Sequence, residues 1–139
     1  RTYRYLGTWT VLADEGQRAN ELHIVYASPG AVDGFQKTGQ FPDGAVLVKE
    51  VFEAGTEHMT TGMVGHAETL KGWFVMVKDS KGHYPGNALW GDGWGWSWFD
   101  VGDPLKTTST DYKTDCLSCH VPAEDSDWIY LQGYPSLKQ

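Results

Sequence analysis

The ten residues AVLVKEVFEA, at positions 45–54, carry the pattern that decides the fold of this chain. Branched and aromatic residues recur within the segment, and this composition predicts a strand. Because successive side chains of a strand point to opposite faces, Lys49 shares a face with Leu47 and Val51. Phe52 belongs to the alternate set of residues. A single lysine therefore interrupts an otherwise apolar face.

Segments on both sides of this strand extend the pattern. Strands are predicted from alternation or from β-branched and aromatic content at residues 3–13, 21–27, 61–70, 71–79 and 88–100, the last with a glycine-induced bulge or bend. The polar residues 14–20 could join the first two strands as an antiparallel pair. The expected core of the fold is thus an antiparallel sheet of about five strands.

Short helices complete the predicted architecture. Residues 28–39 suit a helix that Ser28 caps, that has Pro29 in its first turn and that ends at Gly39. Residues 109–120 can form a helix with a Ser or Thr cap, and residues 124–134 can form another. With 139 residues, the chain is expected to be one α+β domain, with the C-terminal part helical.

The charge balance limits the function classes. Eighteen acidic residues against eleven basic ones give a net charge of −7, and no basic run occurs. Binding to nucleic acid or to an anionic membrane is therefore not expected. The longest apolar stretches, GAVLV and WFVMV, are far too short to span a bilayer.

The motif CLSCH, at positions 116–120, contains the only two cysteines of the chain. A redox-active pair would need a strand–helix–strand context, which the flanking sequence does not predict. A structural zinc site needs four ligands, and His120 directly after Cys119 is a poor third one. A disulfide between Cys116 and Cys119 would close a very short loop and constrain little.

Covalent haem attachment uses all three residues of the motif. Each thiol forms a thioether with a haem vinyl group, and the adjacent histidine binds the iron from one side. Seven Trp, seven Tyr and five Phe can supply the apolar pocket that a haem needs. The motif therefore predicts one haem c per chain, bonded to Cys116 and Cys119, with His120 as the axial ligand. Attachment of this type also implies export from the cytoplasm.

Lys49 has two interpretations beside such a haem. Strand periodicity alone favours a lysine whose ammonium reaches solvent along its methylene chain. A buried amine would lose its proton more easily, because desolvation disfavours the charged form. A neutral amine next to an oxidisable macrocycle is a nucleophile.

Five ordered segments together resemble the cytochrome P-460 family. These segments are TGQFPDGAVLVKE (38–50), VKDS (77–80), PGN (85–87), CLSCH (116–120) and DWIYLQGYPSL (127–137). The resemblance implies a periplasmic homodimer with an antiparallel β fold and a five-coordinate haem that oxidises hydroxylamine. It also implies that Lys49 is bonded to a carbon of the haem macrocycle. The related cytochromes c′-β share the fold, lack this bond, and bind nitric oxide or carbon monoxide in an apolar pocket.

The chain departs from the hydroxylamine oxidisers at one position. Phe74 stands where those proteins carry a carboxylate on the side of the haem away from the histidine. A carboxylate can move protons during oxidation, whereas a phenylalanine only crowds and dries the site. Met76 is predicted on the same face, and with Phe52 these two side chains are expected to wall an apolar pocket.

Three functions therefore remain in view. The first is hydroxylamine oxidation to nitrous or nitric oxide, with electrons passed to a redox partner such as another cytochrome. Another base would then be needed, and the candidates are Glu50, Glu57, His58 and His66. The second is binding of nitric oxide or carbon monoxide without turnover. The third is electron transfer, which needs a second strong axial ligand from a histidine or from Met59, Met63 or Met76.

Overall fold

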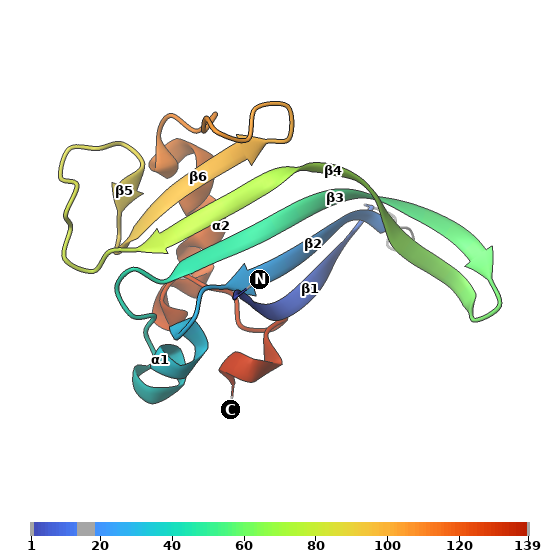
Figure 1. Ribbon diagram of the computed structural model, residues 1–139, viewed down its shortest axis with the longest axis horizontal. Coiled ribbons are helices and arrows are strands. Elements are labelled where there is room, and N and C mark those ends of the chain that lie inside the picture. Colours follow the sequence, from blue (N-terminus) through green and yellow to red (C-terminus); the bar gives the residue numbers. More distant parts are fainter. Residues whose placement is uncertain (1, 14–18, 139) are drawn as a thin grey trace.

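A single antiparallel sheet forms the centre of the molecule. The computed structural model describes residues 2–13 and 19–138, and within these residues the sheet has six strands in the order β1-β2-β3-β4-β6-β5 (Figure 1). The strands are β1 (Arg4–Leu12), β2 (Ala19–Ala27), β3 (Val46–Met59), β4 (Gly62–Lys78), β5 (Trp90–Gly91) and β6 (Trp94–Asp100). The α+β class predicted from the sequence is confirmed, with six strands in place of about five.

Short helical segments lie on one side of the sheet (Figure 1). They are α1 (Ala31–Thr38), η1 (Lys113–Leu117), α2 (Ser118–His120), η2 (Val121–Ser126) and η3 (Pro135–Leu137). The core joins both layers, because Phe35 of α1 and Ile129 of the C-terminal segment cluster with Leu47, Met76 and Trp96 of the sheet. No helix among the described residues is sufficiently long and apolar to cross a membrane.

The strand register aligns side chains of three strands on the inner face. Lys49 pairs with Val25 of β2 and with Phe74 of β4. Two residues earlier along β3, Leu47 pairs with Met76. Since alternate residues share a face, these five side chains form two neighbouring rows on the side that faces the helices.

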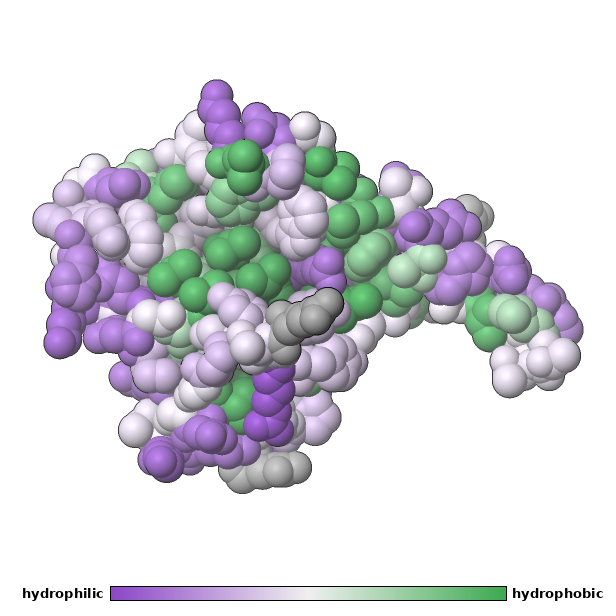
Figure 2. Space-filling model, viewed as in Figure 1, coloured by the Kyte–Doolittle hydropathy of each residue, from purple (hydrophilic) through white to green (hydrophobic). Residues whose placement is uncertain are grey.

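In the part of the chain that the structure describes, no helix packs on the outer face of the sheet. Figure 2 shows apolar side chains gathered near the middle of this face. The outward alternation and partial exposure assign this patch to Val46, Val48, Val75 and Val77. The inner face buries its apolar residues inside the molecule, whereas these four valines stay partly open to solvent.

Two strand predictions need correction. Residues 61–70 and 71–79, predicted as two strands, form one long strand, β4 (Gly62–Lys78). A side chain at position 72 would strike the carbonyl of Phe99 and the ring of Trp98, so glycine there permits close packing between strands. Residues 88–100 form a hairpin instead of one bulged strand. Asp92 and Gly93 have φ values of 55° and 85°, as a two-residue turn requires.

The helix predictions are partly confirmed. Gly39 ends α1 in the left-handed region, and its N–H donates to the carbonyl of Phe35. Ser28 does not cap this helix. Its Oγ instead accepts from the N–H of Val46 at 2.8 Å, and Gly30 occupies the position before α1. The predicted loop of residues 14–20 falls mostly outside the described residues, and β2 already begins at Ala19.

The C-terminal region contains shorter helical segments than predicted. In place of a Ser or Thr cap, Asp111 accepts from the N–H of Lys113 at 2.9 Å, and helical residues continue from there to His120. Of the helix predicted at residues 124–134, only residues 124–126 are helical, as the end of η2. Segment η2 ends at Ser126, because Asp127 and Trp128 have φ values of 57° and 67°.

Candidate functional site

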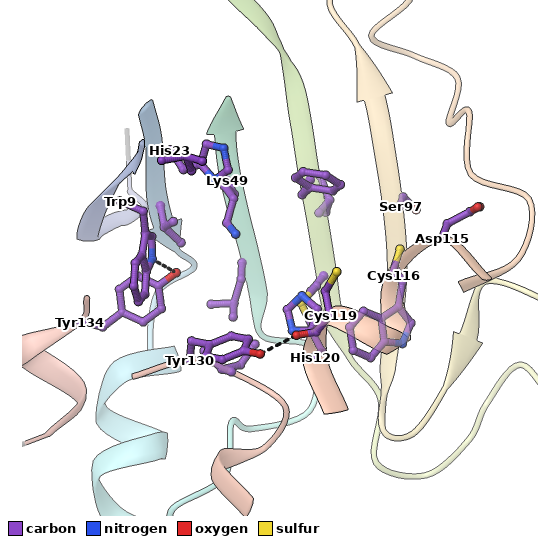
Figure 3. A pocket seen from close by; sticks show the side chains of 18 of the residues that line it. Trp9, His23, Lys49, Ser97, Asp115, Cys116, Cys119, His120, Tyr130 and Tyr134 are labelled. Atoms are coloured by element: carbon purple, nitrogen blue, oxygen red, sulfur yellow. Dashed lines mark hydrogen bonds between the residues drawn. The ribbon is translucent and has the colours of Figure 1, made fainter. Parts of the chain in front are cut away.

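A cavity of about 580 Å³ lies between the inner face of the sheet and the C-terminal segment (Figure 3). This volume is within the roughly 300–1,000 Å³ usual for cofactor sites. Strands β1 to β4 and β6 form one wall, and the opposite wall comes from residues 115–134. The lining is mostly apolar and includes Val25, Leu47, Met76, Trp96 and Ile129. Such a space suits a large flat apolar group that carries few polar contacts.

All three side chains of the CLSCH motif line this cavity. Cys116 lies in η1 and Cys119 and His120 lie in α2, so consecutive helical turns bring them to the same wall (Figure 3). Both cysteines are free. The hydroxyl of Tyr130 donates to the carbonyl of Cys119 at 2.6 Å and ties the motif to the segment that follows η2.

His120 is held in one tautomer. Its Nδ1 lies 2.6 Å from the carbonyl oxygen of Trp128, which can only accept, so Nδ1 carries the proton. Nε2 then keeps a free lone pair, as a metal-binding imidazole requires. Burial lowers the pKa of His120 and thereby favours the neutral ring. Residues of the right type and protonation state are thus present to hold a haem iron from this side.

A buried ion pair fixes the carbonyl that orients His120. Nζ of Lys78 donates to Oδ1 of Asp127 at 2.5 Å, and these side chains are only 5% and 6% exposed. Oδ2 of the same carboxylate accepts from the N–H of Phe41. The backbone carbonyl of Asp127 accepts from Nε1 of Trp94. These contacts hold Asp127 and Trp128 in their left-handed conformation. The separated motifs FPDG, VKDS and DW therefore meet at one carboxylate.

Lys49 lies on the sheet wall, and its side chain points into the cavity (Figure 3). Its Nζ lies 5.9 Å from the centre of the Phe74 ring. Among the described residues it forms no salt bridge, and burial lowers the pKa of its amine. The geometry thus favours the second interpretation of this lysine, an amine in an apolar setting, over one that extends to bulk solvent.

The three residues predicted to wall the pocket divide between the two faces. Phe74 and Met76 line the cavity, and the Phe74 ring packs on Trp98 with 4.5 Å between ring centres. The Phe74 side chain is 40% exposed, so it lies at the rim and does not close the site. The prediction for Phe52 is wrong. It lies on the opposite face of β3, next to a register shift, and does not line the cavity.

The predicted bases do not reach the site. Glu50 is on the outer face of β3, and the other three lie along the far part of the β3–β4 hairpin, which extends beyond the other strands (Figure 1). These three residues are Glu57, His58 and His66. Of the three methionines considered as iron ligands, Met76 lines the cavity, whereas Met59 and Met63 are exposed on the same hairpin.

The structure instead brings His23 to the cavity. Alternation within residues 21–27 places His23 and Val25 on one face, so the sequence carried part of the signal. The missing part was the register that pairs Val25 with Lys49, which no local pattern specifies.

The remaining interpretations of the two cysteines fit the site less well. All pairs in the sheet are antiparallel, so the motif has no strand–helix–strand context. Burial raises the pKa of Cys116 to about 11, whereas redox and metal-binding cysteines have a lowered pKa. Across residues 2–13 and 19–138, no three His, Cys, Asp or Glu side chains converge as metal ligands. The apolar cavity with its two thiols and its oriented imidazole matches haem.

Comparison with known proteins supports this assignment. The family model described as Cytochrome P460 matches residues 1–131 of the 139-residue chain. A search of curated proteins finds no match. The chain therefore belongs to the cytochrome P460 family, which indicates a haem protein that acts on nitrogen compounds.

Proposed function

We propose that this chain is a periplasmic c-type cytochrome that oxidises hydroxylamine. One haem would be bonded to Cys116, Cys119 and Lys49, with His120 as the axial ligand. The observation that carries the proposal is the convergence of two thiols, one oriented imidazole and one amine without a counter-ion on a single apolar cavity.

Bound haem would supply an open coordination position for hydroxylamine and accept its electrons, which pass to a redox partner such as another cytochrome. The protein residues have separate tasks. His120 presents Nε2 because its Nδ1–H is engaged by Trp128. Leu47, Met76 and Ile129 exclude water from the cofactor. The products would be nitrous or nitric oxide.

The bond at Lys49 tests the covalent part of the proposal. One C–N bond would replace an N–H bond of the amine and a C–H bond of the macrocycle. Two protons and two electrons leave, and a peroxide-class oxidant takes up the electrons. A digest of the intact haem protein is expected to yield one haem peptide that carries both the 116–120 segment and the Lys49 segment. Lys49→Arg is the matched control, because arginine keeps the charge and size but should give separate peptides. Separate peptides in the unmodified protein would contradict the bond.

The enzymatic part needs a separate measurement. Steady-state reduction of an artificial acceptor should depend on hydroxylamine, and it should be lost in His120→Ala. Both proteins should be compared at equal haem content. A haem-loaded protein that shows no hydroxylamine-dependent reduction would exclude the oxidase function.

The second candidate is a protein that binds nitric oxide or carbon monoxide without turnover. The observation in its favour is the apolar pair Phe74 and Met76, which makes the β4 part of the cavity wall free of carboxylates. Ferrous protein should then form a nitrosyl adduct, and Phe74→Ala should speed ligand entry because it opens the rim. If the adduct forms and hydroxylamine turnover is absent, the results favour the gas-binding function over hydroxylamine oxidation. Failure to form any adduct would exclude it.

A homodimer is the quaternary state that we propose. The uncovered valines of the outer face, Val46, Val48, Val75 and Val77, offer an apolar surface that a second copy of this face could cover. Sedimentation should give twice the chain mass, and Val48→Lys with Val75→Lys should give the monomer. Glu53→Lys, an exposed change on the same strand, is the control that should stay dimeric.

A further inference from the structure

The sheet wall of the cavity contains an imidazole to which the proposed function gives no role. His23 of β2 lines the cavity next to Lys49, and Figure 3 shows both side chains at the end away from His120. His120 would hold the iron from below in this view. His23 therefore lies toward the side on which a substrate would bind.

The environment of His23 fixes its tautomer. Its Nε2 lies 3.0 Å from Oε1 of Glu21, and the other oxygen of Glu21 accepts from Nζ of Lys71 at 2.5 Å. The bonds from Lys71 and His23 lower the pKa of Glu21, so it is a carboxylate that can only accept. Nε2 of His23 is then the donor, and Nδ1 keeps its lone pair. Nδ1 has no hydrogen-bond partner among the described residues.

The same three residues lead from the cavity to solvent. The side chain of His23 is 15% exposed, that of Glu21 is 22% exposed and that of Lys71 is 43% exposed. Imidazole and carboxylate in hydrogen-bond contact can pass a proton along this gradient. The arrangement matches a base oriented by a carboxylate, with an exit for the proton.

We propose that His23 is the general base of this site and that Glu21 orients it; the proposal rests on hydroxylamine oxidation as the function. Nδ1 takes a proton from hydroxylamine as an N–H or O–H bond breaks. The electron pair of that bond stays on the substrate and leaves through the redox partner. Glu21 stabilises the resulting imidazolium, and the proton departs to water at Glu21. The base that Phe74 cannot provide is thereby supplied from β2.

Charges on three strands act on His23. Burial lowers its pKa most; Glu21 of β2 raises it, and the charges of Lys71 on β4 and of Lys49 on β3, as long as that amine is not bonded to haem, lower it. Trp9, its partner on β1, is neutral. The net effect is a lowered pKa, so the imidazole is unprotonated near neutral pH and ready to accept.

The first test uses a spectroscopic readout that does not depend on turnover. The C–O stretch of the ferrous carbon monoxide adduct is recorded against pH in the unmodified protein, in His23→Gln and in Glu21→Gln. Protonated His23 beside the bound ligand lowers the frequency, so one transition is expected. This pH transition should be absent in His23→Gln. In Glu21→Gln it should move to lower pH, because no carboxylate then stabilises the imidazolium. A band that does not respond to pH would overturn the proposal.

The second test measures turnover with the same proteins. His23→Gln should reduce hydroxylamine oxidation on the order of 10²-fold, the lower range for loss of general base catalysis, and added imidazole should restore part of it. His58→Gln, on the distant hairpin, is the control that should change nothing. Full activity in His23→Gln overturns the base while the proposed function stands. Absence of activity in the unmodified protein overturns both, whatever the C–O band shows.

Discussion

Lys49 and Lys78 extend from neighbouring strands of the same sheet, and each ammonium lies over an aromatic ring. The distance to the ring centre is 5.9 Å for Lys49 over Phe74 and 5.1 Å for Lys78 over Trp94. The two sites differ in one respect. Lys78 contacts the carboxylate of Asp127, whereas Lys49 contacts no carboxylate among the described residues.

This difference distinguishes Lys78, an amine with a structural role, from Lys49, an amine available for reaction. The carboxylate of Asp127 neutralises the charge of Lys78, and the bond between them helps to hold the turn that orients His120. Lys49 forms no salt bridge among the described residues; burial lowers the pKa of its amine, and the nearby Cys119 offsets only part of this effect. The reactive position is therefore the one without a counter-ion.

The largest effect is expected at Lys78. Lys78→Met leaves the carboxylate of Asp127 buried without its partner, and loss of one member of a buried pair costs about 3–5 kcal/mol. The free energy of unfolding of the haem-loaded protein, measured by denaturant titration, should fall by this amount. A loss under about 1 kcal/mol would show that water or another cation replaces the lysine.

A second variant separates the charge from the packing at this site. Lys78→Met combined with Asp127→Asn removes both charges, and asparagine tolerates the left-handed backbone of position 127. Part of the lost stability should return, because no buried charge remains. If the double variant is as unstable as the sum of its parts, the pair contributes through shape and not through charge.

A carboxylate next to Lys49 should remove the contrast between the two amines. Position 74 pairs with position 49 across the strands, so Phe74→Glu would give Lys49 the counter-ion that it lacks before it is bonded to haem. The carboxylate would also offer a base at the rim. The rate of hydroxylamine turnover should therefore exceed that of the unmodified protein, by up to about 10²-fold. Phe74→Gln is the matched control, with similar size and no charge. Equal rates in the two variants would mean that opening the rim, and not the carboxylate, changes turnover.

Local patterns predicted much of the fold and half of the site. Strand periodicity placed Lys49 and Leu47 on one face, and Gly39 marked the end of α1. The spacing of Cys116, Cys119 and His120 needs only a helical segment to bring them to one wall. These features depend on neighbours in sequence, so the sequence alone can specify them.

The remaining features depend on contacts between distant segments. His23 reaches Lys49 only through the β2–β3 register, and Asp127 reaches Lys78 across 49 positions of the chain. The two strands predicted over residues 61–79 are one, β4, because its pairing with β3 and β6 continues through Gly72. The expected helix at residues 124–134 failed because contacts with distant segments hold the same Asp127 in a left-handed conformation.

The difference in stability between the arginine variant and the methionine variant should have opposite signs at positions 49 and 78. No carboxylate lies next to position 49. Lys49→Arg should therefore be less stable than Lys49→Met by about 1–3 kcal/mol, because it buries an unpaired charge. At position 78, Lys78→Arg should be more stable than Lys78→Met, because Asp127 can accept from the guanidinium. Both variants at position 49 lack any bond to haem, so the comparison is not affected by it. The same sign at both positions would refute the distinction.

The smallest effect is expected at Lys71, whose bond to Glu21 has the same length as that of the buried pair but lies near solvent. Lys71→Met should lower the free energy of unfolding far less than Lys78→Met does, and salt should reduce the difference. The pKa of Glu21 is lowered from 4.5 in the folded protein, so its contribution is complete above pH 4.5 and is lost as pH falls through the lowered value. In Lys71→Met this acid dependence should weaken but persist, because His23 still donates to Glu21. A loss as large as that of Lys78→Met would mean that the length of the bond, and not its burial, determines its energy.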